Sequence, residues 1–179
     1  ISEKPGPQGT RNFIISRQER MGKPLQVLIL EGSEDDAELM VWELSSRGFD
    51  VTFKRVETPA AMLAALEAQR WDVILSDSRV HQFTSFEALH ILRERELDVP
   101  FVVVSGAIVE ESAIAAIRAG AHDYISKSRL TRLGPAVERE LLEARVRHEK
   151  KRTDEVERRL MVEQQQAAEH ILEQARLLD

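Results

Sequence analysis

Three short apolar runs decide the fold, and each of them ends in a polar residue. They are VLIL at 27–30, VILS at 73–76 and FVVV at 101–104, followed by Glu31, Asp77 and Ser105. Continuous apolar runs of this length are typical of parallel strands that are buried on both faces. The carboxyl ends of neighbouring parallel strands meet at one edge of a sheet, where ligands bind. We therefore expect two carboxylates and a hydroxyl to form a cation site there, with a reactive group beside it.

Residues 25–134 alternate between strand-like and helix-like segments. The strand-like segments lie near 26–31, 51–56, 72–77, 100–105 and 122–126. The helix-like segments between them are Ala37–Leu44, Ala60–Ala68, Phe86–Leu92 and Ser112–Ala119. Strands that alternate with helical patterns indicate βαβ units and a parallel sheet. The predicted fold class is α/β, a flavodoxin-like (βα)5 doubly wound parallel sheet with a long C-terminal helical extension.

The two flanks of this region have different compositions. Residues 1–24 mix Pro, Gly and polar residues without a sustained period, so we interpret them as a tail or linker. Met21 is a candidate native start, which would make residues 1–20 an upstream extension. From Pro135 to residue 179 there is no further Gly or Pro, and proline suits the first turn of a helix. One helix is therefore predicted over 135–179.

That helix carries a stripe of residues spaced by three, four or seven positions, which we call the helical seam. Its members are Leu142, Val146, Thr153, Val156, Leu160, Ala167, Gln174 and Leu177. Such spacing favours pairing with a partner helix, although Glu149, Glu163 and His170 fall on the same stripe and weaken it. A long helix is marginal without a partner, so we expect a homodimer through 135–179. A solvated helix end is the alternative.

Composition excludes several classes of protein. There is no cysteine, which excludes disulfides, thiolate metal sites and cysteine nucleophiles. The apolar runs are far shorter than the roughly 18 residues of a membrane span, so a cytoplasmic protein is expected. Residues 21–130 hold 18 acidic and 11 basic residues, which disfavours nucleic-acid binding and suits a hard cation. No glycine-rich phosphate loop is present, so an enzyme that uses a nucleotide or flavin fits poorly.

A resemblance to a known family rests on four motifs in a fixed order. They are Leu-Ile-Leu-Glu31 before a helix, Ile-Leu-Ser-Asp77, Val-Val-Ser105-Gly and Tyr124-Ile-Ser-Lys127. Their order and spacing over residues 25–145 resemble those of a response-regulator receiver domain of two-component signalling. Taken singly, each has an ordinary structural explanation, because a strand-ending Asp caps turns and a loop lysine is usually solvated.

The resemblance implies a role for each motif residue. Asp77 would be the phosphoacceptor, while Glu31, Asp77 and the backbone carbonyl of Arg79 would hold Mg²⁺. Ser105 would hydrogen-bond a phosphoryl oxygen, and Lys127 would pair with the carboxylate or the phosphate. Tyr124 would be the aromatic whose rotamer follows Ser105. These roles suit phosphoryl transfer, which depends mainly on charge neutralisation and alignment.

The chain departs from the receiver pattern around the expected cation site. Receivers place two acidic residues after the first strand, whereas here Glu31 is followed by Gly32. The segment after Asp77 has His81 and Ser85 where receivers usually carry Pro and Gly. The loss of a carboxylate predicts weak or absent Mg²⁺ binding. The loss of proline predicts a looser loop.

The acids that follow Gly32 have a simpler explanation than metal binding. Glu34, Asp35 and Asp36 would occupy the first turn of a helix, where negative charge is favourable, and Ser33 is a candidate N-cap. We therefore do not expect them to be metal ligands.

Two functions remain open from the sequence. The first is a receiver module of a phosphorelay that accepts a phosphoryl group on Asp77 from a histidine kinase or phosphotransfer protein, without being an enzyme beyond self-phosphorylation. The second is a pseudo-receiver, a phosphorylation-independent interaction and dimerisation module. The final residues 171–179 resemble the helical lead-in to PAS domains, so a fragment of a larger bacterial hybrid sensor kinase is also expected.

Overall fold

A five-stranded parallel sheet forms the centre of the computed structural model, which describes residues 22–106 and 110–176. The strand order is β2-β1-β3-β6-β7, with all neighbours parallel. The strands are β1 (Lys23–Leu30), β2 (Phe49–Val56), β3 (Val73–Ser76), β6 (Phe101–Ser105) and β7 (Asp123–Ser126). This order is that of a flavodoxin-like sheet, so the predicted fold class is confirmed.

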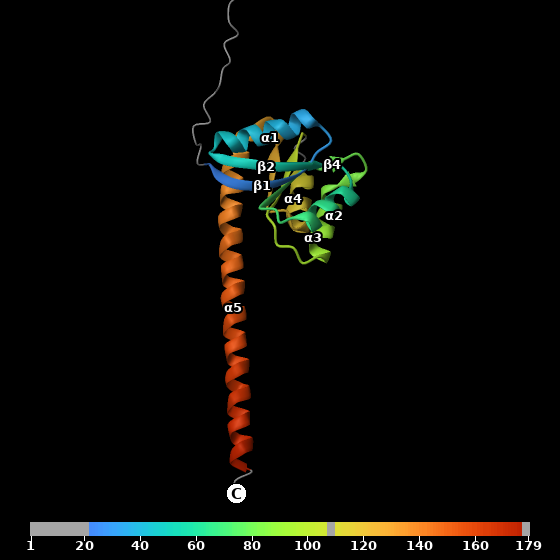
Figure 1. Ribbon diagram of the computed structural model, residues 1–179. Helices are drawn as coiled ribbons and strands as arrows, with labels where there is room; N and C mark the ends of the chain where they lie inside the picture. Colours follow the sequence, from blue (N-terminus) through green and yellow to red (C-terminus); the bar gives the residue numbers. More distant parts are fainter. Residues whose placement is uncertain (1–21, 107–109, 177–179) are drawn as a thin grey trace, which may run out of the picture.

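Helices cover both faces of the sheet (Figure 1). On one face lie α1 (Glu34–Ser46) and α5 (Leu133–Arg176), and on the other lie α2 (Pro59–Ala68), α3 (Ser85–Glu94) and α4 (Glu110–Ala119). The strands supply both cores by alternation, since Val27 and Ile29 pack toward α1 and α5 while Leu28 and Leu30 pack toward the other helices. This explains why the central strands read as continuous apolar runs.

Local signals set the starts of several helices. The Ser33 side chain accepts a hydrogen bond from the Asp36 N–H, which confirms Ser33 as the N-cap of α1. Thr84 and Glu87 form a capping box at the start of α3. At the other end of α1, Gly48 adopts a φ of 86°, a left-handed conformation in which glycine is favoured.

Two short elements were not predicted. A two-stranded hairpin, β4 (Arg79–Val80) with β5 (Phe83–Thr84), follows Asp77, and its Val80 and Phe83 side chains are buried. A 3₁₀ helix, η1 (Lys127–Arg132), connects β7 to α5. Both are too short to leave a periodic pattern in the sequence.

The C-terminal helix is continuous, as predicted, and begins two residues earlier than Pro135. Its first turns pack against α1 and the sheet, with buried side chains up to Ala144. Gly134 permits a close approach, because a Cβ at this position would meet the Arg47 side chain at 2.5 Å. Beyond the sheet α5 extends away from the domain (Figure 1).

No helix in residues 22–106 or 110–176 is both long enough and apolar enough to cross a bilayer. The predicted features that fall within 1–21, including the Met21 start, and Leu177 of the helical seam lie outside the described residues.

Candidate functional site

The candidate site lies at the carboxyl edge of the sheet, between β1 and β3. Glu31 follows β1 and Asp77 follows β3, and the register pairs Leu30 with Ser76 at the ends of these strands. The connection after β1 passes over one face through α1, whereas the connection before β3 passes over the other face through α2. The strand order therefore reverses here, and a doubly wound sheet has its binding crevice at this point.

Lys127 is the centre of the site. Its Nζ atom donates to Glu31 Oε2 at 2.6 Å, to Asp36 Oδ2 at 2.7 Å and to Asp77 Oδ2 at 2.9 Å. The three acceptors come from three separate segments, the end of β1, the first turn of α1 and the end of β3. One ammonium group thus joins the segments that border the crevice.

The electrostatics of this cluster favour a cation. Burial alone lowers the pKa of Lys127, but hydrogen bonds to Asp36, Glu31 and Asp77 outweigh it and raise the pKa above its ordinary value of 10.5. The lysine is therefore charged at neutral pH. With all three carboxylates ionised, one positive charge faces three negative charges, which leaves the cluster with an excess of negative charge.

Glu31 is the most deeply buried member of the cluster, with 3% of the residue exposed. Its Oε1 atom accepts the Ser33 N–H at 2.9 Å, so both carboxylate oxygens have a partner. Arg55 on β2 donates to the backbone carbonyls of Glu31 and Gly32 at 2.9 and 3.3 Å and also pairs with Glu57. These contacts fix the segment between β1 and α1 at the edge of the crevice.

A chain of hydroxyl groups joins Asp77 to Ser105. The Ser78 hydroxyl lies 3.1 Å from Asp77 Oδ1 and 3.1 Å from the hydroxyl of Ser105, the last residue of β6. Ser105 is buried, and Asp77 is partly buried. The predicted residues Glu31, Asp77, Ser105 and Lys127 therefore lie in one hydrogen-bonded group.

Two further predicted residues lie close by in the chain or the sheet. Arg79 follows Asp77 by two residues and begins the β4–β5 hairpin, with its side chain exposed. Tyr124 is on β7, beside β6, and its half-buried side chain packs against the core that α2, α3 and α4 cover.

The three departures from the receiver pattern have defined surroundings. A Cβ on Gly32 would lie 3.6 Å from Val80 Cγ1 and 3.9 Å from His81 Nε2, so the position has room for a side chain. His81 turns the hairpin at a φ of 53°, and its Nε2 lies 3.0 Å from Glu57 Oε2. Ser85 begins α3, and its N–H donates to the Ser78 carbonyl at 3.1 Å. The segment after Asp77 is therefore the β4–β5 hairpin, and the hydrogen bond between Ser85 and Ser78 closes its base. Receivers usually have a loop stiffened by proline here.

The sequence reasoning missed two residues of the site. Asp36 was assigned only to the helix dipole, but its carboxylate also contacts Lys127, so that interpretation was incomplete. Ser78 was not among the predicted site residues, and a serine after a strand-ending Asp is an ordinary turn residue. The sequence carries no signal that separates Asp36 from Glu34 and Asp35, which lie in the same first turn of α1.

The donor set suits a hard cation, with one qualification. Mg²⁺ takes one or two carboxylates together with carbonyl and water oxygens, which Glu31, Asp77 and the Arg79 carbonyl could supply. Within the described ranges, no three histidine or carboxylate side chains are grouped as they would be around a metal ion. The carboxylates are gathered around the Lys127 ammonium instead, so a metal ion must share their oxygens with it.

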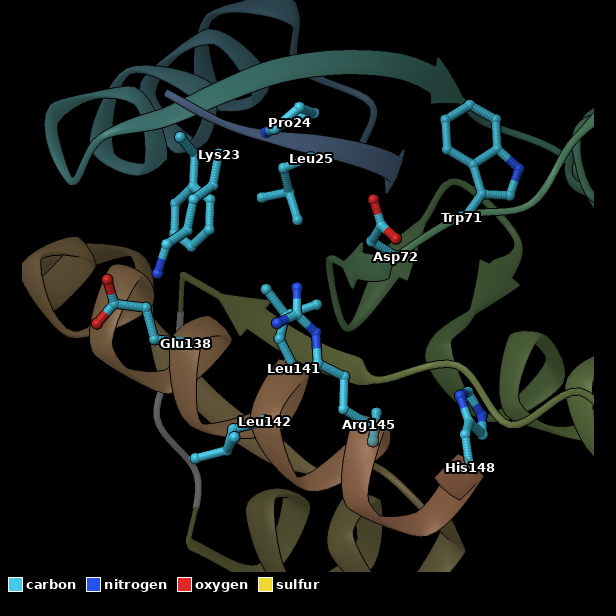
Figure 2. Close-up of a pocket in the computed structure, with 12 residues that line it drawn as sticks. Lys23, Pro24, Leu25, Trp71, Asp72, Glu138, Leu141, Leu142, Arg145 and His148 are labelled. Carbon is cyan, nitrogen blue, oxygen red and sulfur yellow. The ribbon is translucent and has the colours of Figure 1, made fainter. Parts of the chain in front are cut away.

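A cavity of about 430 Å³ lies at the opposite edge of the sheet (Figure 2). It is bordered by the start of β1, by Trp71 and Asp72 before β3, and by α5 residues such as Leu141 and His148. None of the residues of the Lys127 cluster lines it. The cavity is thus separate from the candidate site.

Comparison with known proteins gives a consistent family. Residues 27–138 match the family model of the response regulator receiver domain. The nitrogen assimilation regulatory protein NtrX of Azorhizobium caulinodans is 32% identical over 126 residues, which cover 69% of this chain and 27% of that protein. The photosynthetic apparatus regulatory protein RegA of Rhodovulum sulfidophilum is 29% identical over 114 residues, 64% of this chain and 61% of that protein. The chain spans less than two thirds of the length of either relative.

Solved structures agree on the fold. NtrX from Brucella abortus superposes with a TM-score of 0.64 and 24% identity, over 72% of this chain and 29% of that chain. The receiver domain of the Francisella response regulator 1452 superposes with a TM-score of 0.59 and 21% identity, over 66% of this chain and 98% of that chain.

Proposed function

The chain belongs to the response regulator receiver family, and from this we propose that residues 25–134 accept a phosphoryl group on Asp77 in a phosphorelay. The donor would be the phosphohistidine of a histidine kinase or phosphotransfer protein, or a small phosphodonor. The observation that carries the proposal is that Glu31 and Asp77 meet at one point of the sheet edge. A carboxylate oxygen of each lies within 2.9 Å of the Lys127 ammonium nitrogen.

In the proposed reaction an oxygen of the Asp77 carboxylate attacks phosphorus. A new P–O bond forms, the P–N bond to the donor histidine breaks, and the imidazole leaves with a proton from solvent. The product is an acyl phosphate on Asp77. Phosphoryl transfer needs charge neutralisation and alignment more than covalent help, and Lys127 supplies a positive charge beside the acceptor oxygen.

Mg²⁺ would be held by Glu31, Asp77 and the Arg79 carbonyl, and when bound it neutralises the charge of the transferred group. Ser105 would donate its hydroxyl to a phosphoryl oxygen. It now lies 3.1 Å from the Ser78 hydroxyl, so phosphorylation would exchange one hydrogen-bond partner for another. Tyr124 would follow this change from the neighbouring strand.

The proposal is tested by incubating the protein with acetyl phosphate and Mg²⁺ and measuring its intact mass, beside an Asp77→Asn variant. A single phosphoryl adduct is expected on the wild type only. Peptide mapping then assigns the adduct to Asp77. An adduct of equal amount on both proteins would overturn the assignment of the acceptor.

The alternative function, a pseudo-receiver, is favoured by specific features of the same site. Gly32 removes a carboxylate, and Lys127 already occupies one oxygen of Glu31 and one of Asp77. A folded protein without any adduct would support this alternative, and the fold would then act as a docking surface. The same experiment therefore separates the two functions.

We further propose that residues 135–179 carry the response to a second copy of the chain. Four apolar residues of the helical seam have at least half of their surface exposed in the single chain: Leu142, Val146, Val156 and Leu160. Apolar residues at this spacing are stable when a second helix covers them. This surface would make the module a homodimer whose two helices shift against each other on phosphorylation.

Light scattering of the whole chain tests this dimer. The expected result is a dimer in the wild type and a monomer in the Val156→Lys, Leu160→Lys double variant. The matched control changes Met161 and Val162, which are exposed off the seam, to Lys. A wild-type monomer at high concentration would overturn the proposal.

The cellular context belongs to the same proposal. A cytoplasmic location, a partner histidine kinase, the absence of nucleic-acid binding and a downstream PAS or kinase region would follow from a receiver of this kind.

A further inference from the structure

The first turn of α1 contributes a third carboxylate to the site. Asp36 Oδ2 lies 2.7 Å from Lys127 Nζ, between the separations of 2.6 Å to Glu31 and 2.9 Å to Asp77. Its neighbour Asp35 is exposed on the same helical turn. Position in the first turn alone therefore does not account for the contact that Asp36 makes.

The local backbone holds Asp36 in this place. The Ser33 hydroxyl accepts the Asp36 N–H at 3.2 Å, while the Ser33 N–H donates to Glu31 Oε1 at 2.9 Å. Glu31 and Asp36 thus each hydrogen-bond to Ser33, and the carboxylate of each also accepts a hydrogen bond from Lys127. The ring formed by these four residues fixes the ammonium on the α1 side of the crevice.

We propose that Asp36 is a positioning residue of this site, which draws the Lys127 ammonium toward α1 and supplies the negative charge that position 32 lacks. The inference rests on the proposed function, in which Asp77 accepts a phosphoryl group with the help of a cation. Asp36 acts through Lys127 and through its charge, without contacting the transferred group.

The charges explain what Asp36 changes. With a neutral Asn at position 36, Glu31 and Asp77 are the only charged acceptors of Lys127 in the cluster, and these are the two carboxylates that a cation needs. The ammonium would then compete with Mg²⁺ for both. The cluster would also lose one of its three negative charges, so both effects weaken cation binding in the Asp36→Asn variant.

The first measurement follows the lysine itself, without metal or phosphodonor. The protein is treated with limiting acetic anhydride, and acetylation of Lys127 is measured by peptide mass spectrometry against exposed Lys54 as an internal reference. The three hydrogen bonds to carboxylates hold the Lys127 amine in the cluster and protect it from the reagent. We expect Lys127 to react at least about threefold faster in Asp36→Asn, a change that needs less than 1 kcal/mol.

The matched control is Asp35→Asn, which removes the same charge from the same helical turn. Lys127 should react in this variant as it does in the wild type. Equal labelling of Lys127 in the wild type, Asp35→Asn and Asp36→Asn would overturn the proposal.

The second measurement is calorimetric titration with Mg²⁺. Asp36→Asn should weaken binding by about tenfold relative to Asp35→Asn, as expected for one nearby charge partly screened by water. The Gly32→Asp, Asp36→Asn double variant should recover most of this loss, because position 32 has room for a side chain. A double variant as weak as Asp36→Asn would overturn the claim that the two positions supply the same charge.

The outcomes separate this inference from the proposed function. If the wild type takes neither Mg²⁺ nor a phosphoryl group but Lys127 is released in Asp36→Asn, the phosphorelay function fails and the positioning role stands. If the wild type is phosphorylated and Asp36→Asn changes neither labelling nor Mg²⁺ affinity, the function stands and the positioning role fails.

Discussion

Two ion clusters of opposite composition lie at opposite edges of the sheet. At the carboxyl edge, Lys127 is surrounded by three carboxylates. At the amino edge, Asp98 in the loop before β6 is surrounded by three basic residues of α5, namely Arg147, His148 and Lys151. The peptide from η1 through α5 joins the two clusters, since Lys127 begins η1 and the basic residues lie on α5.

The difference between the clusters shows how placement decides what an ion cluster can do. The Lys127 cluster includes the buried carboxylate of Glu31 and draws on segments far apart in sequence, so its excess of negative charge is concentrated at the carboxyl edge of the sheet. In the Asp98 cluster His148 and Lys151 are exposed and Arg147 is partly exposed, so their charges are screened by water. The first arrangement favours ligand chemistry, and the second anchors a helix where it leaves the domain.

The largest effect is expected when the centre of the buried cluster is removed. Lys127→Met keeps the length of the side chain but leaves Glu31 buried without its cation. The free energy of unfolding should fall by about 2–3 kcal/mol, less than the loss for a fully buried pair because the site is partly solvated. Urea denaturation measures this loss. Lys150→Met, an exposed lysine on α5, should change stability by less than about 0.5 kcal/mol. Equal losses in the two variants would refute the contrast between the clusters.

A smaller effect is expected at the amino edge. Asp98→Asn keeps the shape of the side chain and removes the charge that Arg147 and Lys151 contact, so the base of α5 should open more often. The cost should be about 1 kcal/mol, the upper range for a partly exposed ion pair. Hydrogen exchange of residues 145–151 should speed up accordingly, whereas Asp154→Asn, an exposed change farther along the helix, should leave it unaltered. Unchanged exchange in Asp98→Asn would mean that α5 is anchored by its apolar contacts alone.

The smallest expected effect is the pH dependence of stability, which should have opposite signs for Asp98 and Lys127. Burial raises the pKa of Asp98, but the hydrogen bond and charge of Arg147, together with Lys151, lower it below 3.8. A lowered pKa stabilises the fold above the ordinary value and is lost as pH falls through the folded value. The pKa of Lys127 is raised, so its contribution is present below 10.5 and is lost as pH rises above that value.

Denaturation at a series of pH values tests both signs. The difference between wild type and Asp98→Asn should shrink toward zero in acid, below about pH 4. The part of the Lys127→Met penalty that depends on the ammonium should stay constant from neutral pH to about pH 10 and shrink only in stronger alkali. The opposite pattern for either variant would show that its ion pairs contribute through packing and not through charge.

The sequence predicted the sheet and the strand-end residues because both depend on local pattern. The runs that end at Glu31, Asp77 and Ser105 are continuous and apolar, and parallel topology brings their ends to one edge. Lys127 could be placed by the same rule at the end of β7. The roles of these residues in phosphoryl transfer stay predictions.

The parts that could not be predicted depend on tertiary packing or on short elements. Whether Asp36 points into the crevice or into solvent is set by how α1 packs on the sheet, which the spacing of acids does not reveal. The β4–β5 hairpin contains only two buried side chains, Val80 and Phe83, too few for a period. His81 turns it in a left-handed conformation that is uncommon for residues other than glycine.

The length of α5 gives the Asp98 cluster a mechanical significance. From residue 151 to Arg176 the helix continues for about 39 Å at 1.5 Å per residue. If α5 tilted, it would pivot where its basic side chains contact Asp98. A tilt of about 5° at that point would carry the far tip through about 3 Å. A rearrangement too small to change the packing of the domain would thus become a displacement of atomic dimensions at the end of the helix.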